Sequence, residues 1–220
     1  MAYEWDWSAL WDNLPFLLEG LILTVTASVI SMAAALVLGL FVALARLSGR
    51  WLGAVAQVYI ELFRNVPLLV LVLWVFTVLP LLSGFTMTPL VSGIVALTVN
   101  LSAFIAEIYR AGITSIASGQ THAALAIGMT RTQVLKRIVL PQAVRRVLPA
   151  LGSMWVSLFK DTSILSVIGV GELMYQGRIV ALDTYRPVEV FTGVAVIYYL
   201  LAYPQALGVN WLFAKFQVQE

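Results

Sequence analysis

Long uncharged apolar runs alternate along the chain with short polar or proline-containing breaks. A helix needs roughly 20 largely apolar residues to cross a bilayer, so runs of this length predict membrane-spanning helices. The uncharged stretch 65–106 is too long for one helix, and "LPLLSGFTMTP" divides it with two prolines and a glycine. The predicted spans are about 20–45, 53–79, 90–109, 147–170 and 190–214.

Composition supports this interpretation and excludes an ordinary soluble domain. Hydrophobic residues make up 61% of the 220 residues and charged residues only 11%. The chain has no cysteine, which leaves no disulfide framework and no thiolate metal site. We therefore expect an all-α integral membrane protein with five transmembrane helices and a single transmembrane permease domain over 1–220.

The distribution of basic residues predicts the orientation, because loops rich in Lys and Arg stay in the cytoplasm. Nine of the thirteen basic residues fall on one side of the predicted spans. These nine are Arg46, Arg50, Arg110, Arg131, Lys136, Arg137, Arg145, Arg146 and Lys215. The N-terminus is therefore predicted outside and the C-terminus inside, with 113–146 as a cytoplasmic loop.

This loop carries strong local helix signals. Gly128 follows a run of small residues where a left-handed helix end is expected. Thr130 and Gln133 have the spacing of a capping box, and Pro141 lies where a helix must stop or bend. Such a hairpin fits a docking surface, a purely structural loop or a helix-turn-helix that reads DNA. Because both ends are tethered to membrane spans, we expect no nucleic-acid partner.

A spacing in this loop resembles the signature of permease subunits of ATP-binding-cassette importers. That signature is Glu-Ala-Ala, three residues, Gly, nine residues, Ile, one residue and Leu-Pro. The chain matches six of the seven fixed positions and has His122 where the family usually has Glu. The matching residues are Ala123, Ala124, Gly128, Ile138, Leu140 and Pro141.

Longer stretches extend the resemblance to the polar amino acid branch over essentially the whole chain. They are "ELFRNVPLLVLVLWVF", "EIYRAGITSIASGQ", "LPQAVRRVLPALGS" and "LFKDTSILSVIGVGEL". The N-terminal "YEWDWSALWDNLPFLLEGLILT" is similar to glutamate/aspartate permease subunits in particular. Acidic amino acids are therefore the favoured substrates, and basic ones come second.

The resemblance implies an importer-type fold and a set of partners. A permease of this kind lies in the bacterial inner membrane as a multi-pass protein and pairs with an identical or sister permease. Its loop at 122–141 inserts as a coupling helix into a separate ATPase dimer, which binds ATP and Mg. An extracytoplasmic amino-acid-binding protein delivers the substrate from the other side.

The sequence lacks the motifs of an enzyme. No Gly-x-x-x-x-Gly-Lys-[Ser/Thr] cradle for ATP phosphates and no HExxH zinc motif occurs, and His122 is the only histidine. We expect no catalytic residue, cofactor or metal in this chain. The alternative function is an ion-coupled secondary transporter or channel for small polar solutes, although the five predicted spans show no inverted repeat.

Charged residues inside predicted spans cost about 2.5 to 3.5 kcal/mol each and persist where they face a cavity or a partner. Lys160, Asp161, Thr162 and Ser163 offer an acceptor and a donor that a zwitterionic amino acid needs. They are candidates for the substrate path or for a helix-packing or gating network. Glu61 and Arg64, three residues apart, predict an ion pair or a subunit contact, and Arg64 is also a candidate for the path.

Overall fold

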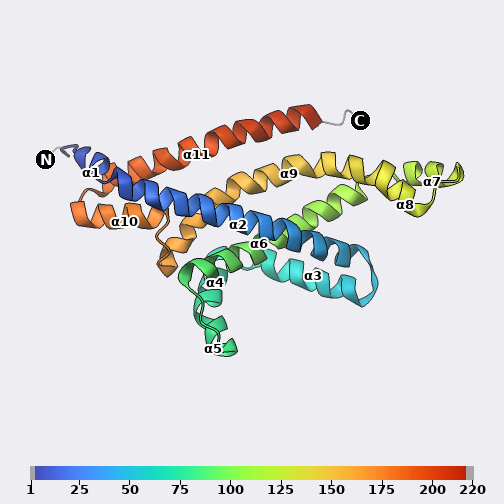
Figure 1. Ribbon diagram of the computed structural model, residues 1–220, viewed down its shortest axis with the longest axis horizontal. Coiled ribbons are helices and arrows are strands. Elements are labelled where there is room, and N and C mark those ends of the chain that lie inside the picture. Colours follow the sequence, from blue (N-terminus) through green and yellow to red (C-terminus); the bar gives the residue numbers. More distant parts are fainter. Residues whose placement is uncertain (1–2, 217–220) are drawn as a thin grey trace. The chain divides into compact units, whose positions relative to one another are not determined.

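The structure is a computed structural model that describes residues 3–216. Within this range the chain forms helices and irregular connections and no β-strand. Figure 1 shows the α-helices in chain order. The elements are α1 (Ser8–Trp11), α2 (Leu14–Leu47), α3 (Arg50–Asn65), α4 (Leu68–Leu73), the π-helix η1 (Trp74–Val78), α5 (Leu79–Ser83), α6 (Pro89–Thr114), α7 (Ser118–Ala126), α8 (Arg131–Val134), the π-helix η2 (Leu135–Val139), α9 (Leu140–Asp161), the 3-10 helix η3 (Thr162–Ile168), α10 (Leu173–Thr184) and α11 (Pro187–Phe216).

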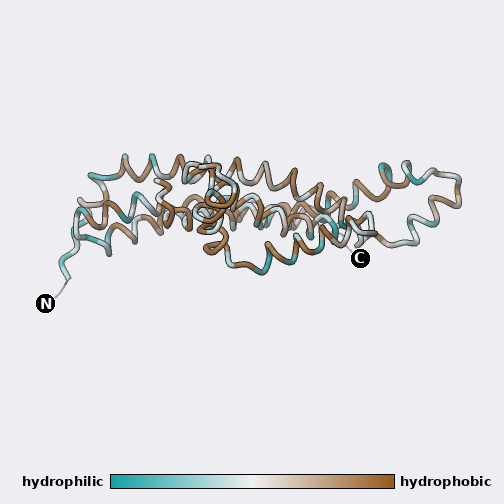
Figure 2. The backbone as a smooth tube through the Cα atoms, turned by 90° about the horizontal axis from the view of Figure 1, so that it is seen from below, coloured by the Kyte–Doolittle hydropathy of each residue, from teal (hydrophilic) through white to brown (hydrophobic). Residues whose placement is uncertain are grey.

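Helices long and apolar enough to cross a membrane occur at Leu14–Leu47, Pro89–Thr114 and Pro187–Ala214. Two bent helix pairs, Trp51–Asn65 with Leu68–Ser83 and Arg131–Ile168 with Leu173–Thr184, raise the number of candidate spans among the described residues to five. Figure 2 shows long stretches of hydrophobic backbone that correspond to such helices. The all-α prediction is confirmed, whereas the number of spans depends on how the bent pairs cross.

The predicted span at about 53–79 is not one straight helix. Its two halves meet at 105°, with α3 ending at Asn65 and α4 beginning at Leu68. Pro67 has an extended ψ of 134°, and a proline also disfavours helical geometry in the residue before it. The "NVP" sequence therefore breaks the helix in the middle of an uncharged run, a break that the apolar run alone does not predict.

Pro141 does not stop the helix as the sequence suggested. The chain stays helical from Arg131 to Asp161, because the π-helical turn η2 directly precedes Leu140 and Pro141. Pro141 has no N–H to donate, and a π turn changes the pairing of backbone groups just before it. The same order, a π turn followed by Leu and Pro, occurs where η1 meets Pro80.

The structure divides into two compact units. The first unit combines the chain up to 33 with 66–98 and 155–205, and the second combines 34–65 with 99–154 and the chain from 206. The long helices α2, α6, α9 and α11 contribute to both. The predicted cytoplasmic loop 113–146 lies wholly in the second unit, and Lys160 to Ser163 lie in the first.

The first unit packs α1, α2, α10 and α11 around a small apolar core. Leu10, Leu17, Leu173 and Val194 are buried together there. Gly193 is needed at a close approach, because a Cβ there would lie 2.4 Å from the Leu10 side chain.

The second unit joins α3 to α6 with side-chain hydrogen bonds. The Tyr59 hydroxyl lies 2.7 Å from that of Ser102, and Asn100 Nδ2 donates to the Phe63 carbonyl at 2.7 Å. Phe63 lies in the last turn of α3, whose carbonyls have no partner within the helix, so Asn100 caps that end. Ala43, Ile60 and Ala106 are buried between α2, α3 and α6.

Candidate functional site: the helical hairpin and the intramembrane charges

The hairpin consists of α7, a turn at Gly128 and the helix that begins with α8. Gly128 has a φ of +87° and no atom within 4 Å of the position of an added Cβ. Its N–H donates to the Leu125 carbonyl at 3.0 Å, and the N–H of Met129 donates to Ala124 at 3.1 Å. These two bonds form a Schellman motif. Glycine is required here by the backbone conformation and not by lack of space, as the sequence predicted.

The second helix of the hairpin starts with the predicted capping box. The Thr130 hydroxyl accepts from the Gln133 N–H at 3.3 Å, and the Gln133 side chain accepts from the Thr130 N–H at 2.8 Å. Two backbone donors at the helix start are thereby satisfied. The turn between the two helices is therefore held by the Schellman motif at Gly128 on one side and by the capping box of Thr130 and Gln133 on the other.

The base of the hairpin is tied by two polar contacts. Gln142 Nε2 donates to Gln120 Oε1 at 2.6 Å, which joins the start of α9 to α7. Arg146 Nη1 donates to the Ser115 carbonyl at 2.7 Å. The hairpin is thus held as a unit without a large apolar core.

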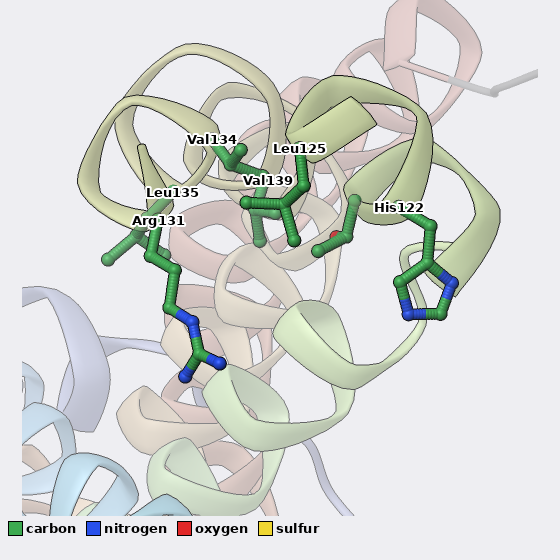
Figure 3. Close-up of a pocket in the computed structure, with 7 residues that line it drawn as sticks. His122, Leu125, Arg131, Val134, Leu135 and Val139 are labelled. Carbon is green, nitrogen blue, oxygen red and sulfur yellow. The ribbon is translucent and has the colours of Figure 1, made fainter. Parts of the chain in front are cut away.

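A pocket of about 380 Å³ opens between the two arms of the hairpin. Figure 3 shows Leu125 and Val139 close together in its centre, with His122 and Arg131 on opposite edges. The lining residues are Thr121, His122, Leu125, Arg131, Val134, Leu135 and Val139. An apolar floor with a cation at its rim can receive an apolar or acidic segment of another protein.

The signature residues divide between holding the hairpin together and facing outward. Ala124 is buried at 3% exposure, and Ile138 is half-buried. His122, Ala123, Gly128, Leu140 and Pro141 are exposed. The small residues therefore allow the arms to approach and leave an open outer surface.

The motif did not identify four residues that shape this surface. Ile127 is 80% exposed, and Leu125, Leu135 and Val139 line the pocket. Their signal in the sequence was the presence of apolar residues in a hydrophilic loop.

Lys160 to Ser163 lie at the junction of α9 with η3. Lys160 is exposed and Asp161 half-buried, and no ion pair joins them in the described part of the chain. The hydroxyls of Thr162 and Ser163 donate to the carbonyls of Phe159 and Lys160 at 2.7 and 2.6 Å. Both hydroxyls thus cap their own helix, and the two charges are the groups left to meet a solute or another helix.

Glu61 and Arg64 do not form the predicted ion pair. Glu61 Oε1 accepts from Gln57 Nε2 at 2.6 Å, one helical turn earlier. The Arg64 guanidinium lies over the Phe104 ring, 5.2 Å from its centroid. The three-residue spacing puts Glu61 and Arg64 on the same side of α3, but Glu61 pairs with Gln57 and Arg64 with Phe104.

Long apolar helices with a capped polar hairpin between them indicate an integral membrane protein. The chain belongs to the family of binding-protein-dependent transport system inner membrane components, which matches residues 35–216. The family predicted from the spacing of the hairpin residues is therefore confirmed.

Known proteins agree with this assignment over nearly the whole chain. The glutamine transport system permease protein GlnP of Escherichia coli is 38% identical over 200 residues, covering 90% of this chain and 91% of GlnP. The glutamate/aspartate import permease protein GltK of Escherichia coli is 34% identical over 221 residues, covering 96% and 97%. A crystal structure of an amino acid ABC transporter with histidines superposes with a TM-score of 0.91 at 32% identity, covering 97% of this chain and 100% of that one.

Proposed function

We propose that the chain is the permease subunit of an ATP-driven, binding-protein-dependent importer of polar amino acids. The observation that carries the proposal is the hairpin of 118–141, an internally capped unit whose apolar pocket and exposed Ile127 have no partner in the described chain. Family membership supports the transport role. The amino acid permeases GlnP and GltK support the class of substrate.

The hairpin serves as the coupling element to a separate ATPase. Burial of apolar side chains such as Ile127 and Leu135 at an interface removes them from water and stabilises the contact by about 25 cal/mol per Å². The caps at Gly128 and Thr130 keep the hairpin rigid, so little ordering entropy is lost on docking. ATP and Mg belong to the partner ATPase, and no cofactor or metal is assigned to this chain.

The predicted orientation and the family membership support a proposal for the remaining assembly. The hairpin faces the cytoplasm, the N-terminus lies outside, and the bent helix pairs complete five spans in the bacterial inner membrane. A second permease, identical or a sister chain, faces the first across the path. An extracytoplasmic amino-acid-binding protein supplies the solute.

Acidic amino acids are the first expected substrates and basic ones the second. Lys160 and Asp161 supply charges of both signs, and neither side chain has a hydrogen bond or ion pair within the described residues. Charges in this state inside a span are stable when a solute path or a partner helix faces them.

Reconstitution tests the proposal and separates it from an ion-coupled transporter. The permease and its ATPase are placed in liposomes with the binding protein on the opposite side from ATP, and uptake of labelled amino acids is measured. We expect uptake that needs ATP and the loaded binding protein. Uptake that continues without ATPase and collapses with an ion gradient would contradict the proposal.

A further inference from the structure

A second pocket, of about 220 Å³, lies within the second unit between the end of α2, the second half of α3 and the last turns of α6. Six polar side chains line it, three of them guanidinium groups and two of them carboxylates. They are Arg46, Gln57, Glu61, Arg64, Glu107 and Arg110. None belongs to the hairpin or to 160–163, so the pocket is a separate feature.

Some of these charges are already neutralised inside the chain. Arg110 Nε donates to both oxygens of Glu107 at 3.1 and 3.0 Å, and its Nη2 adds a further bond to Oε1. This bidentate pair uses the Glu107 carboxylate and the Nε–Nη2 edge of the Arg110 guanidinium. It forms one fixed wall of the pocket.

The other charges are left without a full set of partners. Arg46 has no hydrogen bond or ion pair in the described part of the chain, and Arg64 has only the Phe104 ring. Both line the pocket together with Glu107. Glu61 uses Oε1 for Gln57, and no donor in the described residues reaches its Oε2. Two guanidinium groups and one carboxylate oxygen thus remain available to a ligand.

These groups are held in place by the packing beneath them. Ile60 is buried against Ala43 and Ala106 and forms the floor. The hydrogen bonds of Tyr59 with Ser102 and of Asn100 with Phe63 hold α3 to α6 on either side of it. Because side chains on fixed helices lose little freedom when a ligand arrives, the pocket is preorganised for binding.

We infer that this pocket binds one free acidic α-amino acid. Its two carboxylates pair with Arg46 and Arg64, and its ammonium pairs with Glu61. Arg46, Arg64 and Glu61 together leave a charge of about +1, which balances the net charge of about −1 of such a solute. The phosphate of phosphatidylglycerol comes with no ammonium to pair with Glu61, and the Glu61 carboxylate would repel it. The inference rests on the proposed transport of amino acids and adds a solute site that uses no residue of 160–163.

The test measures binding of labelled L-glutamate to the permease–ATPase complex in lipid nanodiscs without binding protein. L-glutamine and L-arginine serve as competitors. Titrations use the wild type. We expect saturable binding, with glutamate stronger than glutamine and glutamine stronger than arginine.

Variants then locate the site. Loss of one charge-assisted contact in Arg46→Gln or Arg64→Gln should weaken glutamate binding roughly tenfold. Glu61→Gln, which keeps the shape and the contact with Gln57, should also weaken it. Arg145→Gln is the matched control, because Arg145 is exposed on α9 in the same unit and lines neither pocket. Size-exclusion chromatography checks that each variant is folded, because a folded variant co-elutes with the ATPase.

Several results would overturn the inference. Unchanged glutamate binding in the Arg46, Arg64 and Glu61 variants would rule out this pocket as the site. Loss of binding in Asp161→Asn alone would place the solute at 160–163. If the arginine variants change only the stabilisation of the complex by phosphatidylglycerol, the pocket binds lipid. If the wild-type complex imports glutamate but shows no saturable binding, the inferred site is wrong and the proposed function stands. A complex that binds glutamate but never imports with ATP contradicts the proposed function instead.

Discussion

Two buried carboxylates of the first unit have several hydrogen-bond partners within the chain, whereas some charged groups of the second unit have none among the described residues. Glu172, with no exposed surface, accepts from Met174 N–H at 3.0 Å, from Tyr175 N–H at 2.7 Å and from the Tyr198 hydroxyl at 2.9 Å. Glu189, equally buried, accepts from the Asp6 N–H at 2.9 Å and the Tyr3 hydroxyl at 2.5 Å. In the second unit, Arg46 has no such partner and the hairpin pocket is open.

A buried charge is stable only when hydrogen bonds or an opposite charge replace the water it lost. Glu172 and Glu189 meet this condition within the chain, so they are structural. Arg46 and Arg64 of the second unit have no hydrogen bond or ion pair in the described residues, so both cations can meet a partner or a solute. The difference separates residues that hold the fold from residues that act on a partner or a solute.

The largest effect should come from Gly128→Asp. Any side chain at a φ of +87° adds backbone strain of about 1 kcal/mol, and aspartate also brings a charge into the docking surface. We expect ATP-driven uptake to be abolished while the protein still inserts, measured as transport in liposomes and as membrane-extracted yield.

Gly49→Asp is the matched control for that substitution. Gly49 has a φ of +65° and open space around it, and it lies in the turn between α2 and α3. The same strain should therefore arise outside the hairpin, with uptake retained. Wild-type uptake by Gly128→Asp would contradict the coupling role of the hairpin. An equal loss of uptake in both variants would show that backbone strain alone causes the effect.

Glu172→Ala should give the next largest effect, on stability. It leaves two backbone N–H groups and the Tyr198 hydroxyl without an acceptor, at a cost of about 3 kcal/mol. The measurement is the free energy or midpoint of unfolding in detergent. Glu172→Gln keeps an acceptor oxygen and should lose less. An alanine variant as stable as wild type would contradict the structural role of Glu172.

Asp161→Asn should cut uptake about tenfold if the carboxylate pairs with the ammonium of the solute, because one charge-assisted contact is lost. Complex formation and basal ATPase activity should stay near the wild-type values. If the complex itself falls apart, Asp161 belongs to helix packing. A double-mutant cycle with Lys160→Gln shows whether the two side chains act together.

The smallest effect is expected from His122→Glu. His122 is exposed at the rim of the hairpin pocket, and one exposed hydrogen bond contributes only about 1 kcal/mol. We expect near-normal uptake and near-normal ATPase stimulation by the loaded binding protein. Strong uncoupling by this variant would show that the partner ATPase is adapted to histidine.

Local signals in the sequence predicted the hairpin well. The αL turn at Gly128 and the capping box of Thr130 with Gln133 depend on residues within five positions of each other, and the structure has both. Apolar runs likewise predicted α2, α6 and α11, because span length follows from bilayer thickness.

Features that depend on distant partners or on backbone geometry were not predictable. The Glu172 cap needs Tyr198, 26 residues away, and Glu189 needs Tyr3, 186 residues away. The Arg64 guanidinium lies over the Phe104 ring of another helix and does not pair with Glu61, and the 105° bend at Pro67 interrupted an uncharged run. In each case a tertiary contact or backbone geometry outweighed the spacing of residues along the chain.

Single-cysteine labelling tests the docking role of the hairpin most directly, because the chain has no cysteine of its own. Ile127→Cys places a thiol at a site that is 80% exposed, and Glu4→Cys places a control thiol on the exposed N-terminal segment of the first unit. Maleimide labelling of each is followed with and without the ATPase. The account predicts that both thiols react in the permease alone and that the ATPase protects only Ile127→Cys. Equal labelling of Ile127→Cys in the assembled, ATP-hydrolysing complex would contradict it.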